Sequence, residues 1–246
     1  MTVLTIRRYQ IPGAGCAYGP AGNDPFPTVL LLHGSEGGWS GWSHRDAVIL
    51  AAHGFLALPF SYSRGGNTWR AGDIVDVPLD KTADALRALR EHSLTGKIGL
   101  YGISRGAEHA LLLASVMAKE DTQGLPDAVA VHAASDYVVC GFIAADPGAP
   151  WNPELKAWTW RGSYAALPAP GQPIEIENYG GPMLLSHGSF DLLWEVERTR
   201  NLAARLRAAG HNPEVNIYDG QGHSPTGEEE HIHQTFLIDF LRRHLT

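Results

Sequence analysis

The chain has 246 residues, of which 44% are hydrophobic and 18% charged, the composition of a globular domain with a sizeable core. Its net charge of −7, without a long run of Lys or Arg, argues against nucleic acid or an anionic membrane surface as a partner. Its two cysteines, Cys16 and Cys140, cannot form a disulfide framework, and no segment resembles a signal peptide or a membrane span. We therefore expect a cytoplasmic protein with no nucleic-acid partner and no membrane association.

Short apolar runs alternate with longer helical patterns along the chain. The opening segment, 3–11, predicts an antiparallel edge strand or hairpin. The later runs are short and β-branched or leucine-rich, which is typical of strands buried on both faces of a parallel sheet. They cover 28–32, 55–60, 97–101, 128–133, 182–186 and 215–218.

Helical spacing of apolar residues predicts helices over 80–92, 105–119, 194–209 and 229–245. Alternating strands and helices indicate an α/β fold class, with a mostly parallel, doubly wound sheet and helices on both faces. We expect one domain over 1–246. The segment 140–181 is rich in proline, glycine and tryptophan, and we expect it to form a small cap or substrate-binding insertion.

The motif Gly102-Ile103-Ser104-Arg105-Gly106 lies between a predicted strand and a predicted helix. The pattern G-x-S-x-G at such a junction is typical of a nucleophilic serine on a sharp turn. Backbone N–H groups at the helix start then face the position where an oxyanion develops. Ser104 is therefore the candidate nucleophile.

A second glycine-rich turn, His33-Gly34-Ser35-Glu36, follows the predicted strand 28–32. Such a loop supplies the other donor of an oxyanion hole. We expect the backbone N–H of Ser35 or Glu36 to act together with that of Arg105.

The order serine, acid, histidine is the one found in hydrolases of this kind. Asp191 follows the predicted strand 182–186, and His223 follows 215–218, so both would lie at the carboxyl edge of the sheet with Ser104. Asp191 is the favoured acid and Asp136 the alternative. His187 fits a structural role better than a catalytic one.

The stretch 101–115, YGISRGAEHALLLAS, together with Pro173-Ile174-Glu175 and the pair Asp191 and Trp194, carries a family resemblance. It is similar to the C-terminal domain of the acyl-CoA thioesterase / bile acid-CoA:amino acid N-acyltransferase family, and less specifically to dienelactone hydrolases. The resemblance implies the α/β-hydrolase fold over the whole chain. The chain departs from many members in that we expect no room for their additional N-terminal β-sandwich domain. Ser104 stands where the acyltransferases have cysteine, which favours transfer of the acyl group to water.

These residues predict a serine hydrolase that cleaves a small-molecule ester or thioester through an acyl-enzyme, as a monomer or homodimer. The alternatives are an acyltransferase, a lactone or dienelactone hydrolase, and a catalytically silent binding protein. No metal or other cofactor is expected. Candidate substrate-binding residues are Trp151, Trp158, Trp160 and Trp194. Candidate arginines for the phosphates of coenzyme A are Arg64, Arg70, Arg105 and Arg161.

Overall fold

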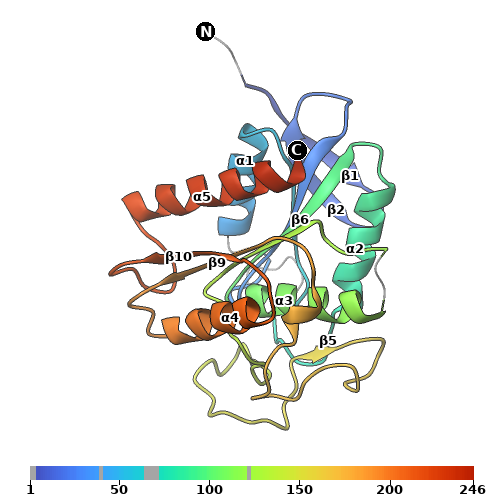
Figure 1. Cartoon of the computed structure of the whole chain (residues 1–246). Helices are drawn as coiled ribbons and strands as arrows, with labels where there is room; N and C mark the ends of the chain where they lie inside the picture. Colours follow the sequence, from blue (N-terminus) through green and yellow to red (C-terminus); the bar gives the residue numbers. More distant parts are fainter. Residues whose placement is uncertain (1–3, 39–40, 64–71, 121–122) are drawn as a thin grey trace.

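The computed structural model describes residues 4–38, 41–63, 72–120 and 123–246 (Figure 1). Within them, eight strands form one sheet in the order β1-β2-β4-β3-β6-β7-β9-β10. β1 (Ile6–Ile11) and β2 (Gly15–Pro20) make an antiparallel hairpin at one edge, and β2 meets β4 antiparallel. The parallel strands are β3 (Phe26–Leu32), β4 (Leu56–Phe60), β6 (Thr95–Ile103), β7 (Ala128–His132), β9 (Met183–Gly188) and β10 (Glu214–Tyr218).

Helices cover both faces of this sheet, as Figure 1 shows. On one face, α1 (Trp42–Ala52) and α5 (Glu228–Leu245) pack against side chains such as Val29 and Leu31. On the other, α2 (Asp80–Glu91), α3 (Arg105–Glu120) and α4 (Val196–Ala208) belong to the core that contains Leu30 and Leu32. Alternate residues of β3 thus point into opposite cores, as the pleat of a strand requires. The architecture is that of the α/β-hydrolase fold.

The strand order reverses beside β3. The chain leaves β3 through α1 and adds β4 on one side, then returns through α2 and adds β6 on the other. Because parallel crossovers are right-handed, opposite directions of travel place α1 and α2 on opposite faces. The reversal leaves a crevice between the carboxyl ends of β3 and β6, where ligands bind in open α/β sheets.

The predicted mostly parallel sheet with helices on both faces is confirmed. Helix α1 was missed because its apolar residues 47–51 are contiguous rather than spaced three and four apart. The predicted helix 194–209 begins two residues later, at Val196, and ends before Gly210, whose φ is 89°.

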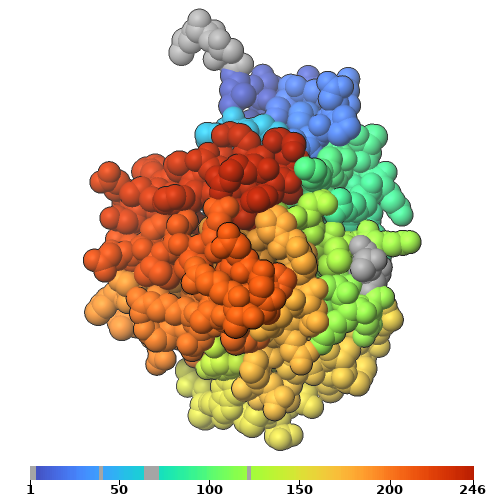
Figure 2. Space-filling model, in the orientation of Figure 1, coloured from blue at the N-terminus to red at the C-terminus, as the bar shows by residue number. Residues whose placement is uncertain are grey.

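The segment 140–181 is largely irregular, with only β8 (Trp158–Thr159) and the 3-10 turn η1 (Ile176–Asn178) as named elements within it. β8 pairs with the equally short β5 (Val77–Pro78) in a separate small sheet. Figures 1 and 2 show most of the segment, in yellow to light orange, gathered at the end of the molecule below α3.

Candidate active site

Ser104 is the single residue between strand β6 and helix α3. Its φ of 55° lies in the left-handed region, which costs a residue with a Cβ free energy and persists only where its surroundings impose it. The Ser104 N–H donates to the carbonyl of His132 on β7, and the Ser104 carbonyl accepts the N–H of Ala107, both at 2.9 Å. Sheet and helix therefore fix the strained turn that presents the Ser104 side chain.

Two glycines make this turn possible. A Cβ on Gly102 would lie 2.2 Å from the carbonyl oxygen of Gly106, and a Cβ on Gly106 would lie 2.3 Å from that of Leu32. No side chain fits at either position. The glycines thus bring the start of α3 against the end of β3, which carries the second glycine-rich loop.

That second loop packs directly on Ser104, since a Cβ on Gly34 would lie 3.3 Å from the Ser104 Cβ. His33 anchors the loop: its ring is stacked 4.1 Å from that of Tyr62, and the Tyr62 hydroxyl donates to the His33 carbonyl at 2.7 Å. Burial lowers the pKa of His33, so its imidazole is neutral at physiological pH. The neighbouring Ser35 lines the same cavity as Ser104.

The Glu36 carboxylate folds back on its own loop. It accepts the N–H of Gly34 at 2.8 Å and the indole N–H of Trp42. Arg105, the first residue of α3, lines the cavity shared by Ser35 and Glu36, and an N–H at that helix position has no intrahelical acceptor. The three candidate oxyanion-hole residues therefore lie around Ser104.

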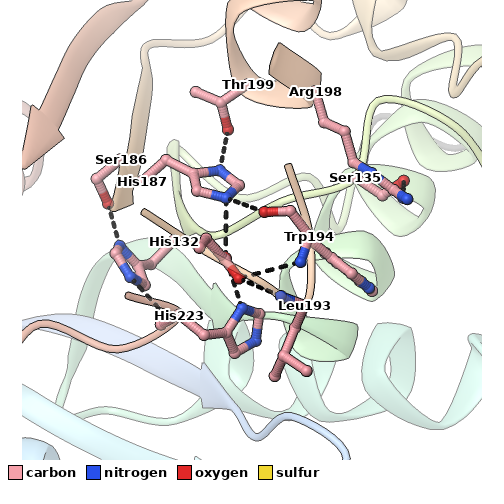
Figure 3. A network of polar contacts seen from close by, with 10 residues as sticks. His132, Ser135, Ser186, His187, Leu193, Trp194, Arg198, Thr199 and His223 are labelled. Carbon is pink, nitrogen blue, oxygen red and sulfur yellow. Dashed lines mark hydrogen bonds and ion pairs between the residues drawn. The ribbon is translucent and has the colours of Figure 1, made fainter. Parts of the chain in front are cut away.

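Asp191 and His223 follow β9 and β10, which are parallel neighbours. The Nδ1–H of His223 donates to Oδ2 of Asp191 at 2.6 Å, the contact drawn in Figure 3. The backbone N–H groups of Leu193 and Trp194 donate to the other oxygen, Oδ1, at 2.8 and 3.0 Å. Burial acts to raise the pKa of Asp191, but hydrogen bonds from His187, His223 and the backbone outweigh it and hold the pKa well below its ordinary value.

A second histidine contacts the same carboxylate. The Nε2 atom of His187 lies 3.0 Å from Oδ2 of Asp191 and 2.9 Å from the carbonyl oxygen of Trp194, while Nδ1 lies 2.8 Å from the hydroxyl of Thr199 (Figure 3). A carboxylate and a carbonyl can only accept, so Nε2 carries the proton and Nδ1 accepts from Thr199. The sequence favoured a structural role for His187, but its spacing of four residues from Asp191 gave no sign of this contact.

His132 fixes the backbone of His223. Its Nε2 lies 3.2 Å from the His223 carbonyl oxygen and its Nδ1 lies 2.9 Å from the Ser186 hydroxyl. Burial lowers the pKa of His132 far below its ordinary value, so one ring nitrogen carries hydrogen and the other accepts. Asp191 thus holds the imidazole of His223, and His132 holds the backbone of the same residue.

Two cavities meet at Ser104 and His223, and both are also lined by Glu36. The larger, of about 480 Å³, lies beside the segment 139–147 and contacts Ser35, Arg105 and Trp194. The smaller, of about 290 Å³, lies against α1 and the start of α5. A substrate whose reacting bond lies over Ser104 has room on both sides.

Of the four candidate substrate-binding tryptophans, Trp194 alone lines either cavity. Trp158 and Trp160 are each 2% exposed, and their indole N–H groups donate to Glu108 and Glu120. Trp151 is half exposed and packs edge-on against Tyr137. These three tryptophans stabilise the segment 140–181 and its packing on the core.

Buried Glu108 explains how this segment is attached to α3. Its carboxylate accepts from the Arg105 guanidinium at 2.7 Å, from the Val139 N–H at 2.8 Å and from the Trp158 indole at 3.0 Å. Arg105 in turn donates to the carbonyl of Cys140 at 2.6 Å. No spacing along the chain indicates this role of Glu108.

The candidate phosphate-binding arginines do not converge within the described residues. The Arg105 guanidinium is buried against Glu108, and Arg161 pairs with Glu120 at the surface. Arg64 and Arg70 lie outside the described residues. The backbone carbonyl of Asp136, the alternative acid, accepts a hydrogen bond from Arg205. The candidate base His223 hydrogen-bonds to Asp191.

Nowhere in the described ranges do three or more His, Cys, Asp or Glu side chains gather in a way that could hold a metal ion. None of the helices in those ranges is long and apolar enough to cross a membrane.

No protein-family model matches the chain. Mouse (Mus musculus) acyl-coenzyme A thioesterase 5 is 29% identical over 220 residues, and mouse peroxisomal succinyl-coenzyme A thioesterase is 27% identical over 215 residues. Each alignment covers 83% of this chain and 50% of the relative. The chain therefore spans about half the length of the curated relatives it matches, and the resemblance inferred from residues 101–115 is confirmed.

Solved structures are similar over almost the whole chain. A protein described provisionally as a dienelactone hydrolase from Klebsiella pneumoniae has a TM-score of 0.68 at 17% identity, covering 98% of this chain and 99% of that one. Carboxyl esterase 2 from Tuber melanosporum has a TM-score of 0.66 at 14% identity, covering 100% and 88%. At these identities the likeness confirms the fold.

Proposed function

We propose that this chain, which has the α/β-hydrolase fold and resembles acyl-CoA thioesterases in sequence, is a serine hydrolase that cleaves carboxylic esters or thioesters. One observation carries the proposal: Ser104, on a strained turn, shares two cavities with His223, whose Nδ1 lies 2.6 Å from Asp191. A carboxylate on Nδ1 leaves the opposite ring nitrogen free to act as a base, as nucleophilic catalysis by serine requires.

In the proposed reaction, the Ser104 Oγ attacks the acyl carbon while its proton passes to Nε2 of His223. The carbonyl electrons move onto oxygen, where the N–H groups of Arg105 and of Ser35 or Glu36 stabilise the charge. The tetrahedral intermediate then expels the alcohol or thiol, which takes the proton from His223. Asp191 holds the imidazole in the required tautomer and stabilises the imidazolium.

The second half of the reaction releases the acyl group. Water attacks the acyl–Ser104 ester and gives its proton to His223, and collapse of this intermediate returns the proton to Ser104 and frees a carboxylic acid. Overall, an ester or thioester and water become an acid and an alcohol or thiol. Relatives named as thioesterases support a thioester, and the solved carboxyl esterase supports an ester.

We also infer a single domain that works in the cytoplasm as a monomer or homodimer, without nucleic acid or membrane. The net charge of −7 and two unpaired cysteines support this.

The test compares the wild type with Ser104→Ala on two kinds of substrate. The esters are p-nitrophenyl acetate, butyrate and octanoate, and the thioester is butyryl-CoA. Ser163→Ala is the matched control, because Ser163 lies in the segment 140–181 and is exposed. We expect Ser104→Ala to lose at least about 10³-fold in kcat with both substrate types, and Ser163→Ala to match the wild type. A fluorophosphonate should label the wild type at Ser104, as mass spectrometry of peptides would show. Equal turnover by wild type and Ser104→Ala would overturn the proposal.

A further inference from the structure

The two cavities beside Ser104 differ in chemistry. The larger one has Val139, Phe142, Leu193 and Trp194 in its lining, and its charged residues are one acidic, Glu36, and one basic, Arg105. The smaller is lined by the carboxylates of Glu36, Asp46 and Glu230, by Arg45 and by the rings of Trp42 and Tyr101. A substrate that fills both cavities therefore has one apolar part and one part that suits a negatively charged, aromatic site.

Asp46 is the buried charge of the smaller cavity. It lies on α1, is 9% exposed, and burial raises its pKa to about 6. Its Oδ1 is 3.4 Å from the Arg45 guanidinium, a long contact, and Oδ2 accepts no hydrogen bond from the described residues. A carboxylate removed from water with so weak a partner is under-compensated.

Arg45 does not balance this charge. Its guanidinium makes a much closer contact with Glu230, so one cation serves two carboxylates. Glu36, the third carboxylate, is held by the Gly34 N–H and the Trp42 indole, which are neutral donors. The described lining thus has three acidic side chains against one basic side chain.

Aromatic rings complete the lining. Trp42 and Tyr101 both line the cavity, with ring centroids 6.3 Å apart and planes at 80°. Tyr101 is 1% exposed and its hydroxyl is engaged with the buried His233, so the half-buried Trp42 offers more of its ring to a ligand. Aromatic faces beside carboxylates are the surroundings that proteins use for ammonium groups.

We propose that the smaller cavity binds a cationic ammonium group of the substrate, and that the larger cavity binds an apolar acyl chain. His223 lines both cavities, so the base can give its proton to a leaving group that is held in the smaller one. The candidate oxyanion donors Ser35 and Arg105 line the larger. The preferred substrate class is then an ester of an apolar acid with an amino alcohol; water converts it to the acid and the free amino alcohol.

This inference rests on the proposed function, and its test separates the two. Butyrylcholine and 3,3-dimethylbutyl butyrate have the same shape, but only the first carries a positive charge. We expect the wild type to prefer butyrylcholine by about tenfold or more in kcat/KM, since about 1.4 kcal/mol of cation binding gives that ratio. Asp46→Asn should bring the ratio near one while the rate with the neutral ester stays within about threefold. Hydrolysis of the neutral ester by the variant also shows that the variant is folded.

Glu228→Gln is the matched control, because Glu228 is exposed on the first turn of α5 and outside the cavity. It removes one negative charge from the protein and should keep the preference. Equal kcat/KM for the two esters in the wild type would overturn the inference, as would an unchanged ratio in Asp46→Asn. A higher kcat/KM with butyryl-CoA than with butyrylcholine would also overturn it.

Binding by the Ser104→Ala protein tests the cavity without turnover. Calorimetry should detect choline binding at least about tenfold tighter than 3,3-dimethylbutan-1-ol, and Asp46→Asn in the same background should abolish the difference. If no ester is hydrolysed but this difference is found, the proposed function fails and the cation site stands. If both alcohols bind equally, the cation site fails whatever the hydrolase does.

Discussion

His187 donates its Nε2–H to Asp191, the carboxylate that also receives Nδ1–H of His223. Both bonds end on the same atom, Oδ2, at 3.0 and 2.6 Å. The donor from His187 stabilises the ionised carboxylate and is one cause of the low pKa of Asp191. Thr199 fixes the tautomer that makes this donation possible. His187 is therefore a positioning residue for the candidate triad.

The first prediction concerns His187→Leu, which removes this donor. A hydrogen bond to a charged group contributes about 1.5–3 kcal/mol, so kcat should fall about 10- to 100-fold with KM little changed. Without the donor, the pKa of Asp191 rises and the carboxylate holds the imidazolium more strongly. The acidic limb of kcat/KM against pH should therefore move to higher pH. Steady-state kinetics between pH 5 and 9 would measure both effects.

His187→Gln supplies the control, because its amide N–H₂ can donate to Asp191 and Trp194. It should recover part of kcat and return the pH profile toward that of the wild type. If His187→Leu lowers the melting temperature but leaves kcat and the pH profile intact, then His187 serves only to pack the core.

The sheet and the three candidate catalytic residues can be predicted from the sequence for a physical reason. Buried parallel strands are rich in apolar residues, and Ser104, Asp191 and His223 each follow a parallel strand that has an apolar run. The residues that hydrogen-bond to them or support them could not be predicted in this way. His187, His132 and Glu108 act through contacts between different elements, and no spacing along the chain encodes those contacts.

The tryptophans show what composition leaves open. Composition drew attention to the aromatic segment 140–181 as a place for substrate, but Trp158 and Trp160 bury their rings and use their N–H groups on acidic side chains of α3. Aromatic residues are large contributors to cores as well as to binding sites. The smaller cavity was missed because its residues come from α1, β6 and α5, which are distant in sequence.

The second prediction concerns Gly106→Ala. A Cβ there would lie 2.3 and 2.4 Å from the carbonyl oxygens of Leu32 and His33, which are backbone atoms of the buried strand end and cannot move aside. The start of α3 must shift, and with it the Ser104 Oγ and the Arg105 N–H. We expect at least a 100-fold loss of kcat/KM, because small displacements of a nucleophile are costly. Ester hydrolysis and near-ultraviolet circular dichroism would be measured together.

Gly180→Ala is the control for this change, since a Cβ there meets nothing within 4 Å. It should keep the wild-type rate and spectrum. A Gly106→Ala protein with full activity would contradict the account of the turn.

The third prediction compares two ion pairs with the same i,i+3 spacing. Arg105 and Glu108 have side chains 4% and 0% exposed, whereas Arg200 and Glu197 have side chains 53% and 59% exposed. Glu108→Gln leaves the Arg105 guanidinium buried without its carboxylate, and breaking a buried pair in this way costs about 3–5 kcal/mol. Glu197→Gln should cost less than about 0.5 kcal/mol. Urea unfolding of both variants at pH 7.5 would measure the difference, and similar values for the two would refute it.

The last prediction concerns the stability cost of Asp46. The pKa of Asp46 is about 6 in the folded protein, against about 3.9 in an unfolded chain. Burial raises this pKa by more than the charge of Arg45 lowers it, and repulsion from Glu230 raises it further. The unfolded state therefore loses its proton first as pH rises. The free energy of unfolding falls between about pH 4 and pH 6, and the loss is complete above pH 6. Asp46→Asn removes this loss.

We therefore expect the stability of Asp46→Asn relative to the wild type to rise by about 1–3 kcal/mol between pH 4.5 and pH 8. Urea unfolding at the two pH values measures this, with Asp239→Asn as the control because the Asp239 side chain is 53% exposed on α5. A residue kept at such a cost is one whose charge serves binding rather than folding. If Asp46→Asn and Asp239→Asn show the same change with pH, then Asp46 carries no unfavourable burial, and the proposed demand of the smaller cavity for a cation loses its energetic basis.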